Sequence, residues 1–200
     1  MNAPPGADHR LLRSDLLPLE TYAVQRAEFR ARAIAHKRLR SVHLGDHLTL
    51  LFEDRLTVQY QIQEMLRIER IFEAAGIQEE LDAYNPLIPD GSNFKATLLI
   101  EYPDAQERSE RLAQLRGIED RFYVQVGDLP RSYAFADEDL GRSNEAKTSA
   151  VHFLRFELDA LSRQSLLQGA VLAFGVDDPR LPRHLALDGA QRQALCADLA

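Results

Sequence analysis

The stretch that decides the fold is FEDRLTVQYQIQEMLRIERIF, residues 52 to 72. It predicts the end of a strand followed by a long helix, because Asp54 or Thr57 can cap a helix start with a short side-chain oxygen. Gly76 follows the last periodic apolar residue and is the expected stop. At 100° per residue, the apolar side chains share one broad face that we expect to be buried: Val58, Ile62, Met65, Leu66, Ile68 and Phe72.

Two polar residues interrupt this face. Glu69 lies near its middle, and Gln61 lies within it. A buried carboxylate is costly unless a cation or several donors meet it, so we expect Glu69 to pair with an Arg, Lys or His from elsewhere. Glu69 is therefore a candidate catalytic carboxylate and Gln61 a candidate ligand contact. The alternatives are a structural ion pair or an exposed helix end for Glu69, and a hydrogen-bonded core residue for Gln61. The opposite face, expected in solvent, carries Gln59, Gln63, Arg67 and Arg70.

Length and composition bound the class of protein. A chain of 200 residues fits one domain and is long enough for a sizeable core. The net charge of −7 argues against nucleic-acid or membrane-surface partners. The single cysteine, Cys196, excludes a disulfide framework within the chain and favours a reducing cytoplasm. The first residues lack the apolar core of a signal peptide, and no apolar run approaches the roughly 20 residues that span a bilayer.

The N-terminal part predicts a tail and then a basic helix. Residues 1–14 are polar with Pro and Gly, typical of a flexible tail, and residues 15–200 are expected to form a single domain. Pro18 favours a helix start, and residues 20–39 form the helix. Its basic residues, Arg38 among them, suggest an anion site. The alternative is that they complement the helix dipole and pair with acids elsewhere.

Residues 41–53 predict a hairpin turning at Gly45-Asp46. With a three-residue loop, we expect Val42 to pair with Leu48 and His43 to face His47. Two facing imidazoles with a carboxylate such as Glu53 would hold a metal ion. The spacing matches no metal signature, so a plain exposed face is the alternative, and we assign no metal ligands.

Two further strands carry the remaining candidate residues. Residues 93–102 alternate, with Glu101 on the second face, where it is either exposed or next to a covered site. In residues 148–159, His152 shares an apolar face with Leu154, Phe156 and Leu158, where a buried imidazole needs a hydrogen-bond partner. Arg155, on the other face, is a candidate partner for Glu69 or Glu101 and a candidate ligand for an anion.

The rest of the chain predicts short alternating elements. We expect helices near residues 104–118, 159–168 and 188–200, short strands near 122–128 and 131–137, and a central strand at 169–176. Residues 137–147 are expected to form a mobile loop from which Arg142 and Lys147 could close on an anion. Gly-rich phosphate loops and metalloprotease and hydrolase motifs are absent from the sequence. We predict an α+β fold with a mostly antiparallel sheet, the long helix packed across it, and an N-terminal helix and hairpin.

Several segments together resemble DUF3501, a bacterial protein family of unknown function, over about residues 22–176. The match runs through residues 36–40, 50–53, 60–61, 63–65, 69–70, 80–81, 86–89, 96–98, 100–101 and 151–154. The resemblance implies no established activity. Genes of this family often lie near those of rubrerythrin-like and iron–sulfur electron-transfer proteins, which implies a redox or peroxide-defence setting. One cysteine is too few to hold an iron–sulfur cluster within the chain.

Three functions remain open. The first, which we favour, is a binding or accessory protein that serves a redox protein. The second is an enzyme acting on an anionic small molecule, with Glu69 or Glu101 as acid or base, His152 as proton carrier, and Arg38 or Arg155 holding the anion. The third is a metalloprotein built on His43 and His47. The sequence indicates no particular cofactor or oligomeric state.

Overall fold

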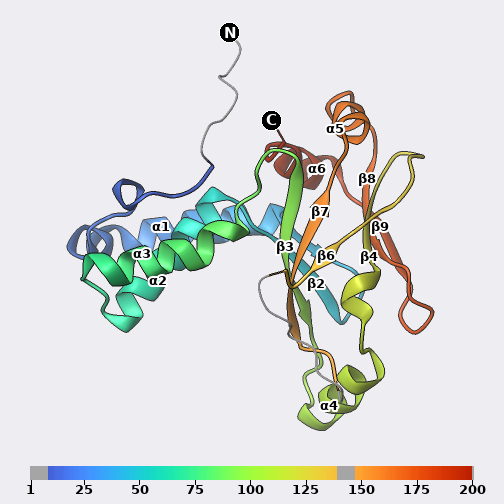
Figure 1. The fold of residues 1–200 in the computed structure, drawn as a ribbon, viewed down its shortest axis with the longest axis horizontal. Helices are drawn as coiled ribbons and strands as arrows, with labels where there is room; N and C mark the ends of the chain where they lie inside the picture. The colour runs from blue at the N-terminus through green and yellow to red at the C-terminus, as the bar shows by residue number, and fades with distance from the viewer. Residues whose placement is uncertain (1–8, 139–146, 200) are drawn as a thin grey trace.

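The computed structural model describes residues 9–138 and 147–199 and has two parts, a body of two sheets and a projecting helical arm (Figure 1). The α+β class is confirmed. The helices are α1 (Leu19–Leu39), α2 (Arg55–Glu69), α3 (Ala74–Tyr84), α4 (Ala105–Gln114), α5 (Ala160–Leu167) and α6 (Gly189–Cys196), with short 3₁₀ turns η1 (Arg13–Asp15), η2 (Asn85–Leu87) and η3 (Ile118–Arg121). None of the helices within the described ranges is both long and apolar enough to cross a membrane.

The strands form two antiparallel sheets. They are β1 (Ser41–His43), β2 (Leu48–Phe52), β3 (Asn93–Ile100), β4 (Phe122–Val126), β5 (Ser132–Tyr133), β6 (Phe135–Ala136), β7 (Val151–Glu157), β8 (Leu172–Val176) and β9 (Arg183–Ala186). The first sheet has the order β1-β2-β3-β7-β6 and the second β5-β4-β8-β9. The apolar strand β8 is central, as predicted, because it pairs with both β4 and β9. Strand β9 was not predicted from the sequence.

The main core lies between the two sheets. Phe52, Phe94 and Phe156 of the first sheet and Phe174 of the second are fully or almost fully buried. The Phe52 and Phe174 rings lie 4.6 Å apart between centroids, and Phe156 meets Phe174 at 5.2 Å. The predicted alternation in residues 93–102 and 151–158 is confirmed, since each strand buries one face against the other sheet.

The hairpin register differs from the expected one. Val42 pairs with Leu50 rather than Leu48, and His43 pairs with Thr49 rather than His47. The Leu44 amide donates to the Leu48 carbonyl at 2.8 Å, which closes the hairpin and shifts the register by two residues. Because Leu44 is buried, this register places in the core a leucine that the expected three-residue loop would leave exposed.

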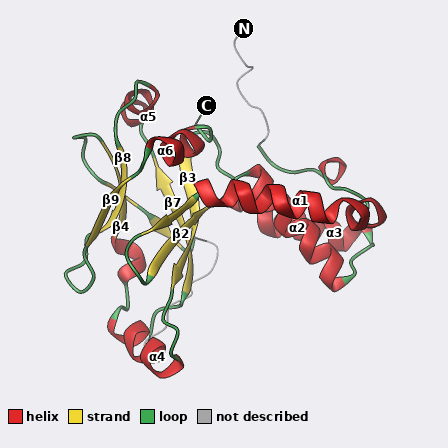
Figure 2. Ribbon diagram, turned by 180° about the vertical axis from the view of Figure 1, so that it is seen from behind, coloured by secondary structure: helices red, strands yellow, loops and turns green. Residues whose placement is uncertain are grey.

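The arm consists of α1, α2 and α3 and has a hydrophobic core of its own (Figure 2). The buried members are Leu11, Val58, Ile62, Leu66, Leu81 and Ile88. The prediction that the long helix lies across the sheet is therefore wrong: α2 packs between α1 and α3. Residues 1–8 of the expected tail lie outside the described residues, but Leu11 is buried, and its amide donates to Asn85 Oδ1 at 2.7 Å. The expectation of a free tail up to residue 14 does not hold for this part.

The start of α2 is as predicted and its end is not. Asp54 caps the helix by accepting from the Thr57 amide at 2.9 Å. The helix ends at Glu69, because Arg70 adopts a left-handed conformation with φ 56°. The chain turns and α3 begins at Ala74, so Gly76 lies inside a second helix instead of ending the first.

Candidate functional site

Glu69 does not meet a basic group. Its side chain is exposed at the last position of α2, and within residues 9–138 and 147–199 it forms no ion pair. The charge of Glu69 acts instead on another carboxyl group, that of Glu80 on α3. Burial of Glu80 raises the pKa of this group, and the negative charge of Glu69 raises it further. The expected burial and pairing of Glu69 are wrong, because α2 ends at this residue and α1 and α3 hold a different side of the helix.

The polar residues of α2 lie the other way round from the prediction. Gln61 is exposed, whereas Gln63, expected in solvent, is fully buried. The Leu17 amide donates to Gln63 Oε1 at 2.6 Å, and Gln63 Nε2 donates to the Leu17 carbonyl at 3.3 Å. Gln63 thus holds the segment before α1 against α2, whereas the Gln61 side chain forms no hydrogen bond among the described residues.

A carboxylate does enter the interface between α1 and α2, but it is Glu64. Tyr22 Oη donates to it at 2.6 Å, and Arg26 donates from Nε and Nη2 at 2.8 Å each. Hydrogen bonding from Arg26, aided by Arg67, lowers the pKa of Glu64 to about 2. The ion pair expected for this helix therefore exists five residues earlier, about 140° away around the helix axis.

The expected facing pair of histidines is not formed. His43 Nδ1 lies 3.0 Å from Thr49 Oγ1, and His47 stacks on Tyr102 with ring centroids 4.1 Å apart. Glu101 is exposed and accepts from Thr49 Oγ1 at 2.7 Å. In the part of the chain that the structure describes, no three His, Cys, Asp or Glu side chains are grouped to hold a metal ion.

His152 is fully buried within a chain of hydrogen bonds. Its Nδ1 lies 2.6 Å from Asp137 Oδ2, and its Nε2 lies 2.9 Å from Thr148 Oγ1, which donates to Glu119 Oε2 at 2.8 Å. The order of carboxylate, imidazole and hydroxyl resembles an activated nucleophile. Thr148 is itself buried, however, and its hydroxyl is engaged on both sides. The chain therefore ties β7 to η3 without presenting a nucleophile to a substrate.

The two candidate arginines lie apart from His152. Arg155 is on the outer face of β7, where it donates to Glu138 at 2.8 Å and 2.7 Å and to Glu157 at 2.5 Å. Its expected pairing with Glu69 or Glu101 is wrong. Arg38 is exposed near the end of α1. The six candidate residues therefore do not assemble into the carboxylate, histidine and arginine pocket that the enzyme hypothesis requires.

Arg40 is a buried ionic residue that was not among the predicted site residues. It is 1% exposed, and its guanidinium contacts Asp198 near the C-terminus and lies 3.6 Å from Asp54. His36 Nε2 lies 2.5 Å from Asp54 Oδ2. The sequence did contain a signal for this burial. Arg40 lies two residues before the inward-facing Val42, and side chains two residues apart along an extended strand point to the same face. This cluster joins the end of α1, the start of α2 and the chain after α6.

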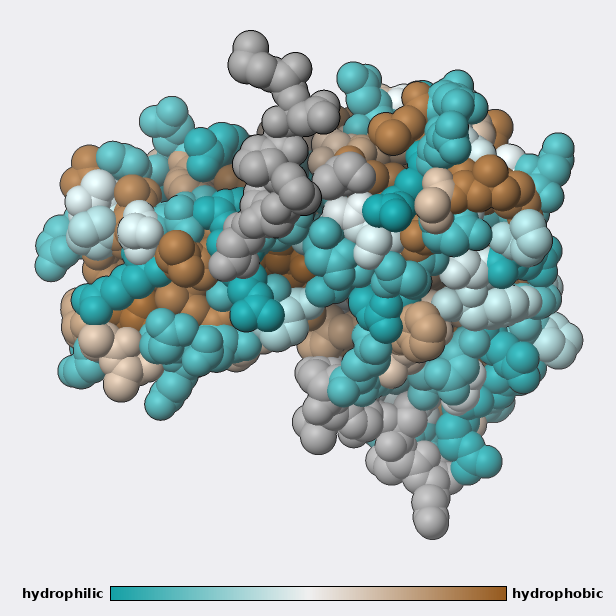
Figure 3. All heavy atoms as spheres, turned by 45° about the horizontal axis from the view of Figure 1, so that its top comes forward, coloured by the Kyte–Doolittle hydropathy of each residue, from teal (hydrophilic) through white to brown (hydrophobic). Residues whose placement is uncertain are grey.

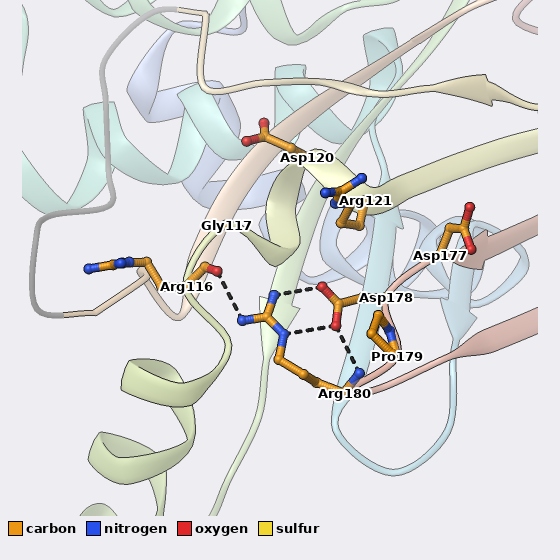
Figure 4. Close-up of a pocket in the computed structure, with 8 residues that line it drawn as sticks. All are labelled: Arg116, Gly117, Asp120, Arg121, Asp177, Asp178, Pro179 and Arg180. Carbon is orange, nitrogen blue, oxygen red and sulfur yellow. Dashed lines mark hydrogen bonds and ion pairs between the residues drawn. The ribbon is translucent and has the colours of Figure 1, made fainter.

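A groove of about 640 Å³ lies on the body between η3 and the turn after β8 (Figure 4). It is lined by Arg116, Gly117, Asp120, Arg121, Asp177, Asp178, Pro179 and Arg180. None of these residues was predicted as a site residue, because their local pattern is that of a charged surface turn. A volume in this range is typical of ligand sites, so the groove is a candidate binding site.

A second groove, of about 320 Å³, lies at the free end of the arm and is mainly apolar. Its walls come from the start of α1, the end of α2 and the start of α3: Arg13, Leu16, Leu17, Pro18, Leu19, Glu20, Leu66, Ile71, Phe72 and Ile77. Phe72 is 60% exposed although it was expected in the core. The same early end of α2 that exposes Glu69 puts this ring at the surface.

Comparisons with known proteins identify relatives without an assigned activity. The model of a family described as "Protein of unknown function (DUF3501)" matches residues 10–199. A crystal structure of a novel protein of unknown function from Burkholderia pseudomallei is 53% identical, with a TM-score of 0.90 over 95% of this chain and 99% of that chain. A search of curated proteins finds no match.

Proposed function

We propose that this chain, which belongs to the DUF3501 family of proteins of unknown function, is an accessory protein that binds a partner protein through its helical arm. The partner we propose is a redox protein with an acidic surface. The redox setting comes from the gene neighbourhood that the family resemblance implies, and the acidic surface from the charge of α1.

The observation that carries the proposal is the apolar groove at the end of the arm. Phe72 lines it with 60% of its surface exposed, and Ile68 on the last turn of α2 is 61% exposed. Apolar side chains are visible on the surface of the arm between hydrophilic ones (Figure 3). Exposed apolar patches rimmed by polar groups are typical of protein interaction sites. A partner would fit here by inserting an apolar side chain.

The charge of α1 favours an acidic partner. The helix carries five basic and two acidic residues, a net charge of +3, in a chain whose net charge is −7. Arg30 and Arg38 are exposed, and neither forms an ion pair within the described ranges. A local basic surface on an acidic protein steers an acidic partner to one region, which raises the association rate at low salt.

A photo-crosslinking experiment tests this proposal. Benzoylphenylalanine replaces Phe72 in the groove or, as a control, Leu161, which is 57% exposed on α5 of the body. After irradiation in cells, we expect a covalent adduct with one protein at position 72 and none at position 161. The adduct is identified by mass spectrometry, and a partner with an iron–sulfur or di-iron centre would support the redox assignment.

Binding of the purified partner then measures the two contributions. We expect Phe72→Asp and Arg38→Glu each to weaken binding by about tenfold or more, since each removes a central or steering contact. The matched control, Leu161→Asp, should leave the dissociation constant unchanged. Equal crosslinking at both positions, or binding that neither arm variant weakens, would overturn the proposal.

A further inference from the structure

The groove of Figure 4 lies on the body, and most of its charged groups are already paired within the protein. Arg180 donates from Nε and Nη2 to Asp178 at 2.8 Å and 2.6 Å, and from Nη1 to the carbonyls of Gln114 and Arg116 at 2.7 Å and 3.1 Å. Arg180 is thus a fixed clamp between α4 and the turn after β8. One N–H of its Nη2 has no acceptor in the described part of the chain.

Asp177, on the other side of the groove, is also paired. It accepts from Tyr133 Oη at 2.6 Å and lies 3.2 Å from Arg131 Nη1. These internal contacts account for Asp177, Asp178 and Arg180, the three charged residues on that wall. They leave η3 as the side on which a ligand would find available charges.

Two opposite charges on η3 form no side-chain hydrogen bond or ion pair in the part of the chain that the structure describes. Asp120 and Arg121 are exposed, both line the groove, and neither forms a side-chain hydrogen bond or ion pair within residues 9–138 and 147–199. They are adjacent in a 3₁₀ turn, where successive side chains diverge by about 120°. Asp120 and Arg121 therefore form no ion pair with each other, although the charge of Arg121 acts to lower the pKa of Asp120 and of Asp178. Each side chain can still contact a different part of a ligand.

We infer that this groove binds a small zwitterion of the α-amino-acid class, with Arg121 holding its carboxylate and Asp120 its ammonium group. Arg121 offers five N–H donors in a planar fork, which matches a carboxylate, and the spare N–H of Arg180 lies in the same groove. A purely anionic ligand would leave Asp120 facing it without compensation, and a purely cationic ligand would do the same to Arg121.

The ionisation of Asp120 adds a pH dependence. Its surroundings desolvate the carboxyl and raise its pKa, and the charges of Glu119 and Asp137 raise it further, while Arg121 and His152 act in the opposite sense. An ammonium group binds only the ionised carboxylate. The affinity for a zwitterion should therefore rise as the pH rises through the pKa of Asp120, whereas the affinity for a ligand without an ammonium group should not rise.

Calorimetric titration of the full chain with the twenty free L-amino acids is the first measurement. For each amino acid that binds, its N-acetyl form, which lacks the ammonium group, and its amide, which lacks the carboxylate, are titrated in parallel. We expect at least one amino acid to bind, and both derivatives to bind at least tenfold more weakly.

Three variants then assign the two contacts. Arg121→Gln should weaken the free amino acid and its N-acetyl form at least tenfold. Asp120→Asn should weaken the free amino acid at least tenfold but the N-acetyl form less than threefold. Arg30→Gln, an exposed arginine on α1, is the matched control and should change nothing. All three positions are exposed, so thermal unfolding should show folded variants.

Several results would overturn the inference. They are no heat of binding for any amino acid at 10 mM, derivatives that bind as tightly as the parent, or an Arg121→Gln variant that binds like the wild type. None of these results depends on the arm, so failure here leaves the proposed partner binding untouched.

Discussion

Replacement of Arg40 by methionine tests how the arm is joined to the body. Arg40 Nε donates to the Phe52 carbonyl at 3.1 Å, Nη1 to the Ala194 carbonyl at 3.0 Å, and Nη2 to the Glu53 carbonyl at 3.0 Å and to the Asp198 carboxylate. Arg40→Met keeps an aliphatic side chain of similar length and removes every one of these donors. The end of α1 then loses its links to β2 and to the chain after α6.

The magnitude follows from the burial of the charges. Breaking a buried ion pair by removing one partner costs about 3–5 kcal/mol, because the other charge remains buried without compensation. The side chain of Asp198 is 7% exposed. Burial raises the pKa of Asp198 to about 6. Below this pH the carboxyl group takes up a proton, so no uncompensated negative charge is left buried in the variant. We expect Arg40→Met to lower the free energy of unfolding by about 3 kcal/mol at pH 5 and about 5 kcal/mol at pH 8.

Urea unfolding followed by circular dichroism at both pH values measures this loss. Arg38→Met is the matched control, because Arg38 is exposed two residues earlier and forms no ion pair within the described ranges. It should change the free energy of unfolding by less than about 0.5 kcal/mol. In a double-mutant cycle with Asp198→Asn, the coupling energy should be about 2–3 kcal/mol. The reasoning is refuted if Arg40→Met costs no more than Arg38→Met, or if the cycle shows no coupling.

Three further predictions concern the ionisable carboxyl groups. The pKa of Asp198 is about 6 in the folded protein and 3.8 ordinarily, so the folded protein binds a proton at this carboxyl group more tightly than the unfolded chain does. The free energy of unfolding of the wild type should therefore fall by up to about 3 kcal/mol as the pH rises from 4 to 6, and urea unfolding of Asp198→Asn should not show this fall. Glu64 has a lowered pKa, so its contribution is present above its ordinary 4.5 and lost as the pH falls through about 2; Glu64→Gln should cost about 2 kcal/mol in chemical denaturation at pH 7 and much less near pH 2. Glu69→Gln should shift the urea midpoint by an amount equivalent to less than about 0.5 kcal/mol, and a larger loss would mean that this carboxylate has a partner after all.

The strands were predictable because one physical rule decides them. In residues 93–102, every second side chain is apolar, and a sheet packed on one face buries that set whatever lies opposite. The same rule places His152 on the inner face of β7. It does not give the register, because pairing Val42 with Leu48 or with Leu50 buries side chains of the same parity. The loop closure at Leu44 makes that choice, and it depends on the whole core.

The orientation of α2 was not predictable from its own sequence. A helical wheel drawn through Phe72 includes apolar residues that lie beyond the end of α2 at Glu69. Their inclusion moves the predicted apolar face toward Glu69. The left-handed residue that ends the helix is Arg70, which carries no glycine signal. The contacting helices α1 and α3 then select the side with Val58, Ile62 and Leu66, and they bury the polar Gln63 because it satisfies the backbone of Leu17.

The candidate sites were hidden for a related reason. Asp120 and Arg121 are ordinary surface residues by composition, and only the turn after β8, more than 50 residues later, makes a groove beside them. Conversely, Glu69, Arg155 and His152 have the right chemistry for one site, but Glu69 ends α2 in the arm, and Arg155 and His152 lie on opposite faces of β7. A site is a long-range property, whereas periodicity reports only which face of one element is covered.

The separation of the two hydrophobic cores bears on how both proposals can be tested. The arm buries its own cluster around Ile62, and the body buries another around Phe174. Phe72 lies on the arm and Arg121 on the body, on surfaces that share no core contacts. A substitution at Phe72 should therefore leave amino-acid binding unchanged, and a substitution at Arg121 should leave partner binding unchanged. Arg40 lies at the junction, and its loss would change how the arm is held without removing either groove. If Arg40→Met weakened partner binding but left amino-acid binding intact, the orientation of the arm, and not the arm surface alone, would be part of the recognition.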